Sequence, residues 1–188
     1  MNIYIYDGPF EKGEKGYALI KRAIGMYCLE NEMYFEPADL EIGTKEKGKP
    51  YLAYGCEMGK IEFSLSHSGS LWMCLVGDCP CGLDVQIEKP CSFEEIAKKF
   101  FTHNEQHYVE LWGSTGFYEL WVRREAFGKV TGEGFHGKMP EFVTCDCDLA
   151  DSVELDGQTY FFSKIEIADD IKCAICTTKQ EQIEIRSL

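Results

Sequence analysis

Apolar and polar side chains alternate over residues 1–7, which is the period of a β-strand. Over residues 16–31 the apolar side chains instead return at the spacing of a helix that buries one face, so a helix is predicted there. A Gly48-Lys49-Pro50 turn then leads into a short extended segment. The first part of the chain is therefore expected to combine a helix with strands.

Three segments between residues 61 and 87 have the character of consecutive β-strands. Polarity alternates over residues 61–65 and 82–87, whereas residues 71–76 are apolar throughout. Turn-forming residues separate the three segments, which predicts an antiparallel meander. Asp84 and Gln86 share one face of the last strand and His67 follows the end of the first, so these side chains are predicted to lie near one another.

Two capping-box patterns mark the beginnings of the next helices. Ser92 with Glu95, and Thr102 with Glu105, have the spacing at which an N-cap side chain and an acidic side chain bind each other's backbone amides. The two helices are predicted to end near residues 101 and 112, and glycines at 113 and 116 then interrupt the chain.

The segment 120–129 places charged side chains in a helix that is apolar around most of its circumference. Arg124, Glu125 and Lys129 must then lie close to buried walls, where charges are usually paired or bind a charged ligand. Glu125 and Lys129 stand about one helical turn apart, so an ion pair within a core helix is one interpretation and a ligand site is the other. Later strands are predicted over residues 142–145, 159–167, 172–177 and 182–186.

Composition and charge narrow the functional classes. With 188 residues, of which 45% are hydrophobic, the chain is long enough for one domain or two small ones. Its net charge of −13 argues against binding to a nucleic-acid backbone. No apolar run approaches the roughly 18 residues of a membrane-spanning helix, and the beginning lacks the pattern of a signal peptide, so a cytoplasmic protein is expected.

The ten cysteines have two interpretations. In a cytoplasmic protein, reduced and buried thiols are expected. The alternative is structural zinc, for which Cys79 with Cys81 and Cys145 with Cys147 are candidate ligand pairs. The Cys-x-x-Cys at 173–176 lies in a predicted strand, which points its two thiols to opposite faces and disfavours a shared metal.

Several of these segments, in this order, resemble the motifs of the 4′-phosphopantetheinyl transferases of the surfactin-synthetase-activating type. The family has a Ser-His-Ser strand end, a Gly-(Ile/Val)-Asp-(Ile/Val)-Glu strand and a Trp-x-x-Lys-Glu-(Ala/Ser)-x-x-Lys helix. The matching segments here are Ser66-His67-Ser68, Gly82-Leu83-Asp84-Val85-Gln86 and the helical residues from Trp121 to Lys129. The family's Gly-Lys-Pro is matched at residues 48–50, and the resemblance is good from there to about residue 134.

The resemblance implies an α+β fold of two similar α/β lobes related by a pseudo-twofold axis, each a small, mostly antiparallel sheet with a packed helix. The lobes would comprise residues 1–88 and 89–188, with a metal site between them. It also implies a monomeric enzyme that uses Mg²⁺ to transfer the 4′-phosphopantetheine group of coenzyme A to a serine of an apo acyl or peptidyl carrier protein, with release of 3′,5′-ADP.

The same resemblance assigns roles to individual side chains. Metal binding is assigned to Asp84, Gln86 and Glu125. Contact with coenzyme A is assigned to Lys49, Pro50, Ser66, His67, Arg124 and Lys129. Catalysis is assigned to Glu125, Asp84 and Lys129, with Glu125 or a metal-bound water as the base.

Departures from the family pattern leave other interpretations open. Gln86 replaces a carboxylate, so it offers a metal an oxygen but no charge. The family's basic segment ahead of the first helix is represented only by Lys12 and Lys15, and Lys45 and Lys47 are possible substitutes. A non-catalytic relative that binds a carrier protein or coenzyme A is the alternative, and a zinc-binding interaction module, based on the paired cysteines, is a third interpretation.

Overall fold

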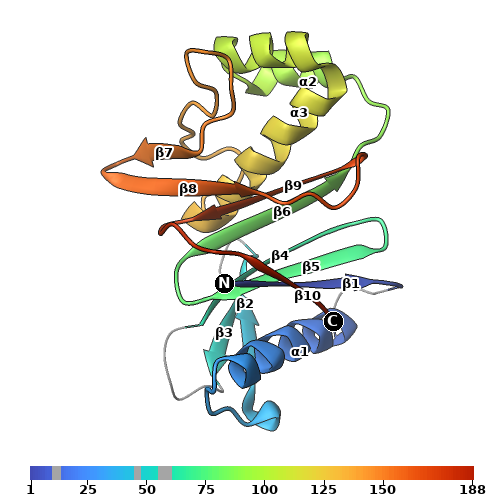
Figure 1. Cartoon of the computed structure of the whole chain (residues 1–188), viewed down its shortest axis with the longest axis vertical. Coiled ribbons are helices and arrows are strands. Elements are labelled where there is room, and N and C mark those ends of the chain that lie inside the picture. The colour runs from blue at the N-terminus through green and yellow to red at the C-terminus, as the bar shows by residue number, and fades with distance from the viewer. Residues whose placement is uncertain (10–13, 45–47, 55–60) are drawn as a thin grey trace.

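The computed structural model describes residues 1–9, 14–44, 48–54 and 61–188, which form an α+β protein (Figure 1). In chain order the elements are β1 (Asn2–Asp7), α1 (Glu14–Glu30), the 3-10 turn η1 (Pro37–Asp39), β2 (Glu41–Thr44), β3 (Pro50–Tyr54), β4 (Glu62–Ser68), β5 (Leu71–Gly77), β6 (Cys81–Ile87), α2 (Phe93–Phe100), α3 (His103–Thr131), β7 (Ser152–Leu155), β8 (Gln158–Lys164), β9 (Ile171–Thr177) and β10 (Glu184–Ser187). Along the long axis of Figure 1, α1, a first sheet, a second sheet and the α2–α3 pair follow one another.

The first sheet has the strand order β10-β1-β5-β4, and α1 covers one of its faces. β1 pairs antiparallel with β5 and parallel with β10, where Ile3 lies opposite Ile185. The core under α1 also takes in side chains from the β2–β3 ribbon, and its large members are Tyr4, Ile20, Ile24, Phe63 and Trp72. The predicted strand at 1–7 and the predicted helix at 16–31 are confirmed.

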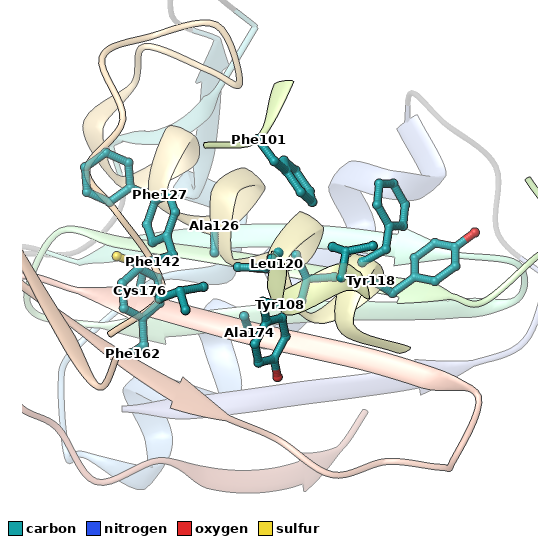
Figure 2. Close-up of a cluster of buried hydrophobic side chains, with 14 of the residues drawn as sticks. Phe101, Tyr108, Tyr118, Leu120, Ala126, Phe127, Phe142, Phe162, Ala174 and Cys176 are labelled. Carbon is teal, nitrogen blue, oxygen red and sulfur yellow. The ribbon is translucent and has the colours of Figure 1, made fainter. Parts of the chain in front are cut away.

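The second sheet has the strand order β6-β9-β8-β7, and α3 packs across β6 and β9. Aromatic side chains fill the space between this sheet and the helix (Figure 2). The ring centroids of Phe127 and Phe142 lie 5.5 Å apart, and those of Phe142 and Phe162 lie 5.6 Å apart, both in edge-on contacts. This core fixes α3 on the sheet.

The predicted meander over 61–87 is wrong at its last strand. β4 and β5 pair antiparallel, but β6 leaves them and pairs with β9, where Asp84 lies opposite Ala174. Leu83 and Val85 pack with Met73 and side chains of both sheets in a core between the sheets. A strand that is buried on both sides gains more from this position than from extending the first sheet, and local turn signals do not reveal that choice.

The helix boundaries follow the predicted signals with one exception. Thr102 and Glu105 form the predicted capping box. Ser92 makes no capping hydrogen bond, because its φ of −79° and ψ of 62° are not the extended conformation that aims an N-cap side chain at the helix amides. Gly113 breaks the helical geometry with a φ of 60°, as predicted, and α3 resumes directly after it and ends at Thr131, with Gly132 as its C-cap.

The last third of the chain departs from the prediction in two places. Residues 142–145 contribute only an isolated bridge between Val143 and Leu149, because the chain turns back immediately. β7 was not predicted, whereas the strands predicted at 159–167, 172–177 and 182–186 are confirmed within a few residues as β8, β9 and β10.

The two large sheets exchange strands across residue 88. β6 precedes that residue but belongs to the second sheet, and β10 follows it but belongs to the first. The division into lobes 1–88 and 89–188 and their pseudo-twofold relation stay predictions. None of the described helices is both long enough and apolar enough to cross a membrane.

Most of the cysteines in the described part of the chain are buried thiols, as expected. Cys173 and Cys176 enter different cores, as the alternation of a strand requires. Cys79 has Asp78 and Glu181 as neighbours, and their potential ligand atoms lie within 4.8 Å of one another. That group does not include Cys81, which was the predicted zinc partner of Cys79.

Candidate active site

Gly82 sets the distance between β6 and α3. A methyl group on Gly82 would lie 1.9 Å from the carbonyl oxygen of Ala126 and 2.9 Å from the backbone nitrogen of Val130. Glycine is the residue that permits this approach, so the backbones of strand and helix come into direct contact. The contact brings Lys129 alongside Asp84, the residue two positions after Gly82.

An ion pair between Asp84 and Lys129 lies at the centre of the site. Lys129 Nζ is 2.7 Å from Asp84 Oδ1, and it also donates to the carbonyl oxygens of Leu83 at 2.8 Å and Leu65 at 3.3 Å. Ser66 Oγ lies 2.7 Å from the same Asp84 oxygen. Because Asp84 is only 7% exposed, these two donors replace most of the hydration of its carboxylate.

Glu125 stands next to this ion pair on α3 and is half-buried. Burial raises the pKa of its carboxyl, and the negative charge of Asp84 raises it further, whereas Lys129 and His136 lower it. Two carboxylates and two basic side chains therefore act on one another in one small region. The hydrogen bonds of Lys129 go to Asp84 and to carbonyls rather than to Glu125, so the ion pair within the helix that was one interpretation is not formed.

A cavity of about 490 Å³ opens beside Lys129. Its walls come from the turn before β3, from β4 and from the end of α3, and they include Lys49, Pro50, Ser64, Lys129 and Glu133. Lys49 Nζ donates to the carbonyl oxygens of Lys129 at 2.8 Å and Cys81 at 3.2 Å. Two lysines thus lie in the wall of a cavity in a chain whose net charge is −13. A cavity of this size and charge suits a phosphorylated ligand.

Gln86 is half-buried and lies opposite Lys172 of β9. Lys172 Nζ is 3.0 Å from Glu88 Oε1, and Glu88 also accepts hydrogen bonds from Ser114 and Thr115 of α3. Glu88 is therefore held at the kink of the helix. It is not placed to supply the carboxylate that Gln86 lacks.

His67 is exposed near the end of β4. Neighbouring residues of a strand point to opposite sides, so the bond between Ser66 and Asp84 means that His67 points away from Asp84. The backbones of His67 and Asp84 are therefore close, as predicted, but their side chains point apart. Its contact with coenzyme A stays a prediction.

Arg124 makes an ion pair with Glu105, and its contact with coenzyme A stays a prediction. Its Nη1 lies 2.8 Å from Glu105 Oε2, and the guanidinium also stands over the rings of Phe101, Phe135 and Phe142 at 5.3 to 5.7 Å from their centroids. Arg124 is 6% exposed and Glu105 is 0% exposed. A buried guanidinium in an ion pair needs that partner for its own charge, so this geometry supports a structural role.

Sequence reasoning missed several residues around the site. The alternation of β4 puts Ser64, Ser66 and Ser68 on one face, a signal that was present but could not show which strand lies opposite. His136 and Lys172 carry no local signal, because distant segments bring them to the site. Lys12, Lys45 and Lys47, named as possible contacts for a phosphate, lie outside the described residues.

The donor atoms at this site suit a hard divalent cation. Asp84 and Glu125 offer carboxylate oxygens and Gln86 an amide oxygen, on the neighbouring elements β6 and α3. The Asp84 charge that raises the pKa of Glu125 is the repulsion that a cation would relieve. Mg²⁺ prefers oxygen ligands and commonly takes one or two carboxylates, so the residues fit this ion.

Comparisons with known proteins agree with the geometry. A family model described as the 4′-phosphopantetheinyl transferase superfamily matches residues 80–176. A 4′-phosphopantetheinyl transferase of Bacillus subtilis is 34% identical over 150 residues, covering 75% of this chain and 64% of that protein. The transferase Sfp of Bacillus subtilis strain 168 is 31% identical over 157 residues, covering 79% and 67% respectively. A phosphopantetheinyl transferase of Thraustochytrium sp. is 27% identical over 178 residues, covering 83% and 61%. The matches thus span about two thirds of the length of these relatives. This chain belongs to the 4′-phosphopantetheinyl transferase superfamily.

Proposed function

We propose that the chain transfers the 4′-phosphopantetheine group of coenzyme A to a serine hydroxyl of an apo acyl or peptidyl carrier protein, and that it requires Mg²⁺. The observation that carries the proposal is the convergence of Asp84, Glu125 and Lys129 next to a cavity with a lysine-bearing wall. Membership of the superfamily supports the same reaction.

The transfer is a displacement at phosphorus. The serine oxygen of the carrier forms a bond to the phosphorus that bears the pantetheine arm, and the bond from that phosphorus to the oxygen of the neighbouring phosphate breaks. The bonding electrons leave with 3′,5′-ADP, and the serine proton passes to a base. Glu125 is the candidate base, because its carboxylate lies beside Asp84 and Lys129 at the site.

The basic side chains have a separate task in this proposal. Lys129 and Lys49 lie in the cavity wall, where their positive charges would act on the pyrophosphate and stabilise the negative charge that grows on the leaving phosphate. Asp84, Gln86 and Glu125 would hold Mg²⁺, which would supply charge neutralisation at the pyrophosphate. With Gln86 neutral, the protein contributes two carboxylates rather than three, so a weaker metal affinity is expected.

The direct test incubates the purified chain with coenzyme A, Mg²⁺ and several apo-carrier proteins and then weighs the carriers. We expect at least one carrier to gain the phosphopantetheine mass and 3′,5′-ADP to appear in equal amount. If an established transferase modifies the same carriers and this chain modifies none, the proposed activity is wrong. The expectation of a cytoplasmic monomer belongs to the same proposal and is checked by cell fractionation and analytical ultracentrifugation.

Variants connect the activity to the site. We expect Asp84→Ala and Glu125→Ala to abolish transfer while the chain still folds, because each removes a carboxylate that would hold the metal and leaves the apolar cores intact. Glu110→Ala is the matched control, since Glu110 is an exposed carboxylate on the same helix and pairs with His107. Carrier binding without any Mg²⁺-dependent binding of coenzyme A would instead identify a non-catalytic relative.

A further inference from the structure

β4 and β6 lie side by side without a backbone ladder between them. β6 is an edge strand of the second sheet and pairs through its other side with β9. The backbone amides on its other side have no neighbouring strand to bond with, and three buried serine hydroxyls of β4 accept hydrogen bonds from them. The donor–acceptor pairs are Leu83 N to Ser64 Oγ at 3.0 Å, Val85 N to Ser66 Oγ at 3.2 Å and Ile87 N to Ser68 Oγ at 2.9 Å. Side chains therefore join the two sheets along this seam.

Ser66 differs from the other two serines by one further bond. All three hydroxyls accept an amide of β6, but Ser66 also lies 2.7 Å from Asp84 Oδ1. A carboxylate can only accept, so the Ser66 hydroxyl is the donor in this bond. The length is typical of a hydroxyl bonded to an ionised carboxylate.

These two bonds leave the Ser66 hydroxyl little to offer a phosphate. A serine hydroxyl has one proton, and that proton is given to Asp84. Its oxygen already accepts the Val85 amide, and a phosphate oxygen needs a donor rather than an acceptor. Ser66 is also 6% exposed, and the cavity is lined by Ser64 instead.

The same bond fixes one oxygen of Asp84. Ser66 and Lys129 both donate to Oδ1, from opposite elements, and Val85 N ties Ser66 to the strand that carries Asp84. With Oδ1 held on two sides, the plane of the carboxylate is set and Oδ2 is left for a cation.

We propose that Ser66 is a positioning residue that orients Asp84 for the metal, rather than a residue that contacts coenzyme A. This inference rests on the proposed function, because it assumes that Asp84 is a metal ligand. Ser64 and Ser68 serve to join the sheets and do not share the role of Ser66.

The seam supplies its own controls for a test. Ser68→Ala removes an acceptor of a β6 amide and leaves Asp84 untouched, whereas Ser66→Ala removes both an acceptor and the bond to Asp84. Ser66→Thr keeps the hydroxyl, and a β-branched residue suits a strand. Circular dichroism and urea unfolding establish that each variant is folded before binding is measured.

The readout is Mn²⁺ affinity, followed by electron paramagnetic resonance at saturating coenzyme A and without a carrier, so that no turnover occurs. Residues that orient a metal ligand typically contribute roughly 10- to 100-fold to metal affinity, so Ser66→Ala should weaken Mn²⁺ binding by that factor. The Mn²⁺ affinity of Ser68→Ala and of Ser66→Thr should stay within about threefold of the parent's, because both variants keep the hydrogen bond from the hydroxyl of residue 66 to Asp84. Coenzyme A affinity at saturating Mn²⁺ should be unchanged in Ser66→Ala.

Three results would overturn the assignment. Unchanged Mn²⁺ affinity in Ser66→Ala, together with a loss of coenzyme A affinity, would make Ser66 a direct contact. Equal losses of Mn²⁺ affinity in Ser66→Ala and Ser68→Ala would mean that both serines only join the sheets. If the parent chain binds no Mn²⁺, the metal site of the proposed function fails and the role of Ser66 fails with it. A chain that shows the expected Mn²⁺ series but modifies no carrier would instead contradict the transfer activity alone.

Discussion

Replacing Gly82 with alanine is predicted to separate α3 from β6 and to disable the site without touching a charged residue. The added methyl group would lie 1.9 Å from the carbonyl oxygen of Ala126, and real contacts of this kind are not shorter than 3.0 Å. The helix must therefore retreat by about 3.0 − 1.9 = 1.1 Å. The neighbouring atom belongs to a helix backbone, so it cannot turn aside as a side chain would.

The retreat has two calculable consequences. If Lys129 moves with the helix, its 2.7 Å bond to Asp84 lengthens to about 2.7 + 1.1 = 3.8 Å and is lost as a hydrogen bond. Overpacking of this kind costs about 1–3 kcal/mol, and a rigid backbone contact favours the upper end. For a chain of this size, a loss of about 3 kcal/mol corresponds to a fall in Tm of roughly 6–12 °C. A misplacement of about 1 Å at a catalytic group can reduce the rate by about 100-fold.

Thermal unfolding and the rate of carrier modification, measured on the same preparation, test both consequences. Gly25→Ala is the control, because its methyl group would meet only the ring of Phe35, at 3.2 Å, within α1. Alanine is the better helix former by up to about 1 kcal/mol, which offsets the tight contact with Phe35, so the control should lie within about 1 kcal/mol of the parent. A Gly82→Ala variant with the Tm and the rate of the parent would refute the claim that this contact positions the site.

Three further predictions concern the charges around the site. Glu105→Ala should lower the free energy of unfolding by about 3–5 kcal/mol in urea, because it leaves Arg124 buried without its partner. Replacing both residues with apolar ones should restore much of that free energy. Equal losses of stability in the single and double variants would argue against the ion pair. In the metal-free chain the unfolding free energy should fall as pH rises through the raised pKa of Glu125, because the folded state binds that proton more tightly than the unfolded state. An identical pH dependence in Glu125→Ala would contradict the placement of Glu125. Gln86→Glu should strengthen Mn²⁺ binding roughly tenfold, because it adds a negative charge to the site. The affinity is measured by the electron paramagnetic resonance titration described above. An unchanged affinity would place Gln86 outside the metal site.

Residues close together in the chain were the easier part of the site to predict. Strand alternation put Asp84 on the polar face of β6, and helical spacing put Glu125 and Lys129 on one side of α3. Both inferences depend only on backbone periodicity. The partner of each charge could not be predicted in this way. Lys129 bonds with Asp84 rather than with Glu125, and the close contact of α3 with β6 at Gly82 brings the lysine to the strand.

Long-range pairing accounts for the wrong meander and for the unpredicted partner of Arg124. The turn after β5 looks like that of a meander, yet β6 crosses to the second sheet, where apolar side chains from both sheets enclose it. Arg124 pairs with Glu105, which lies in α3 before the kink at Gly113, and the sequence pattern did not indicate this partner. In both cases burial against a distant segment decided the outcome, and a single sequence does not specify that segment.

The central claim is that Asp84 and Glu125 of this chain form an active site for phosphopantetheine transfer, and mass spectrometry of an apo-carrier protein tests it most directly. After incubation with coenzyme A and Mg²⁺, the account predicts a carrier heavier by one phosphopantetheine group with the parent chain and with Glu110→Ala. It predicts an unchanged carrier with Asp84→Ala or Glu125→Ala. A carrier that stays unmodified by the parent chain, or that is modified equally by all four proteins, would contradict the account.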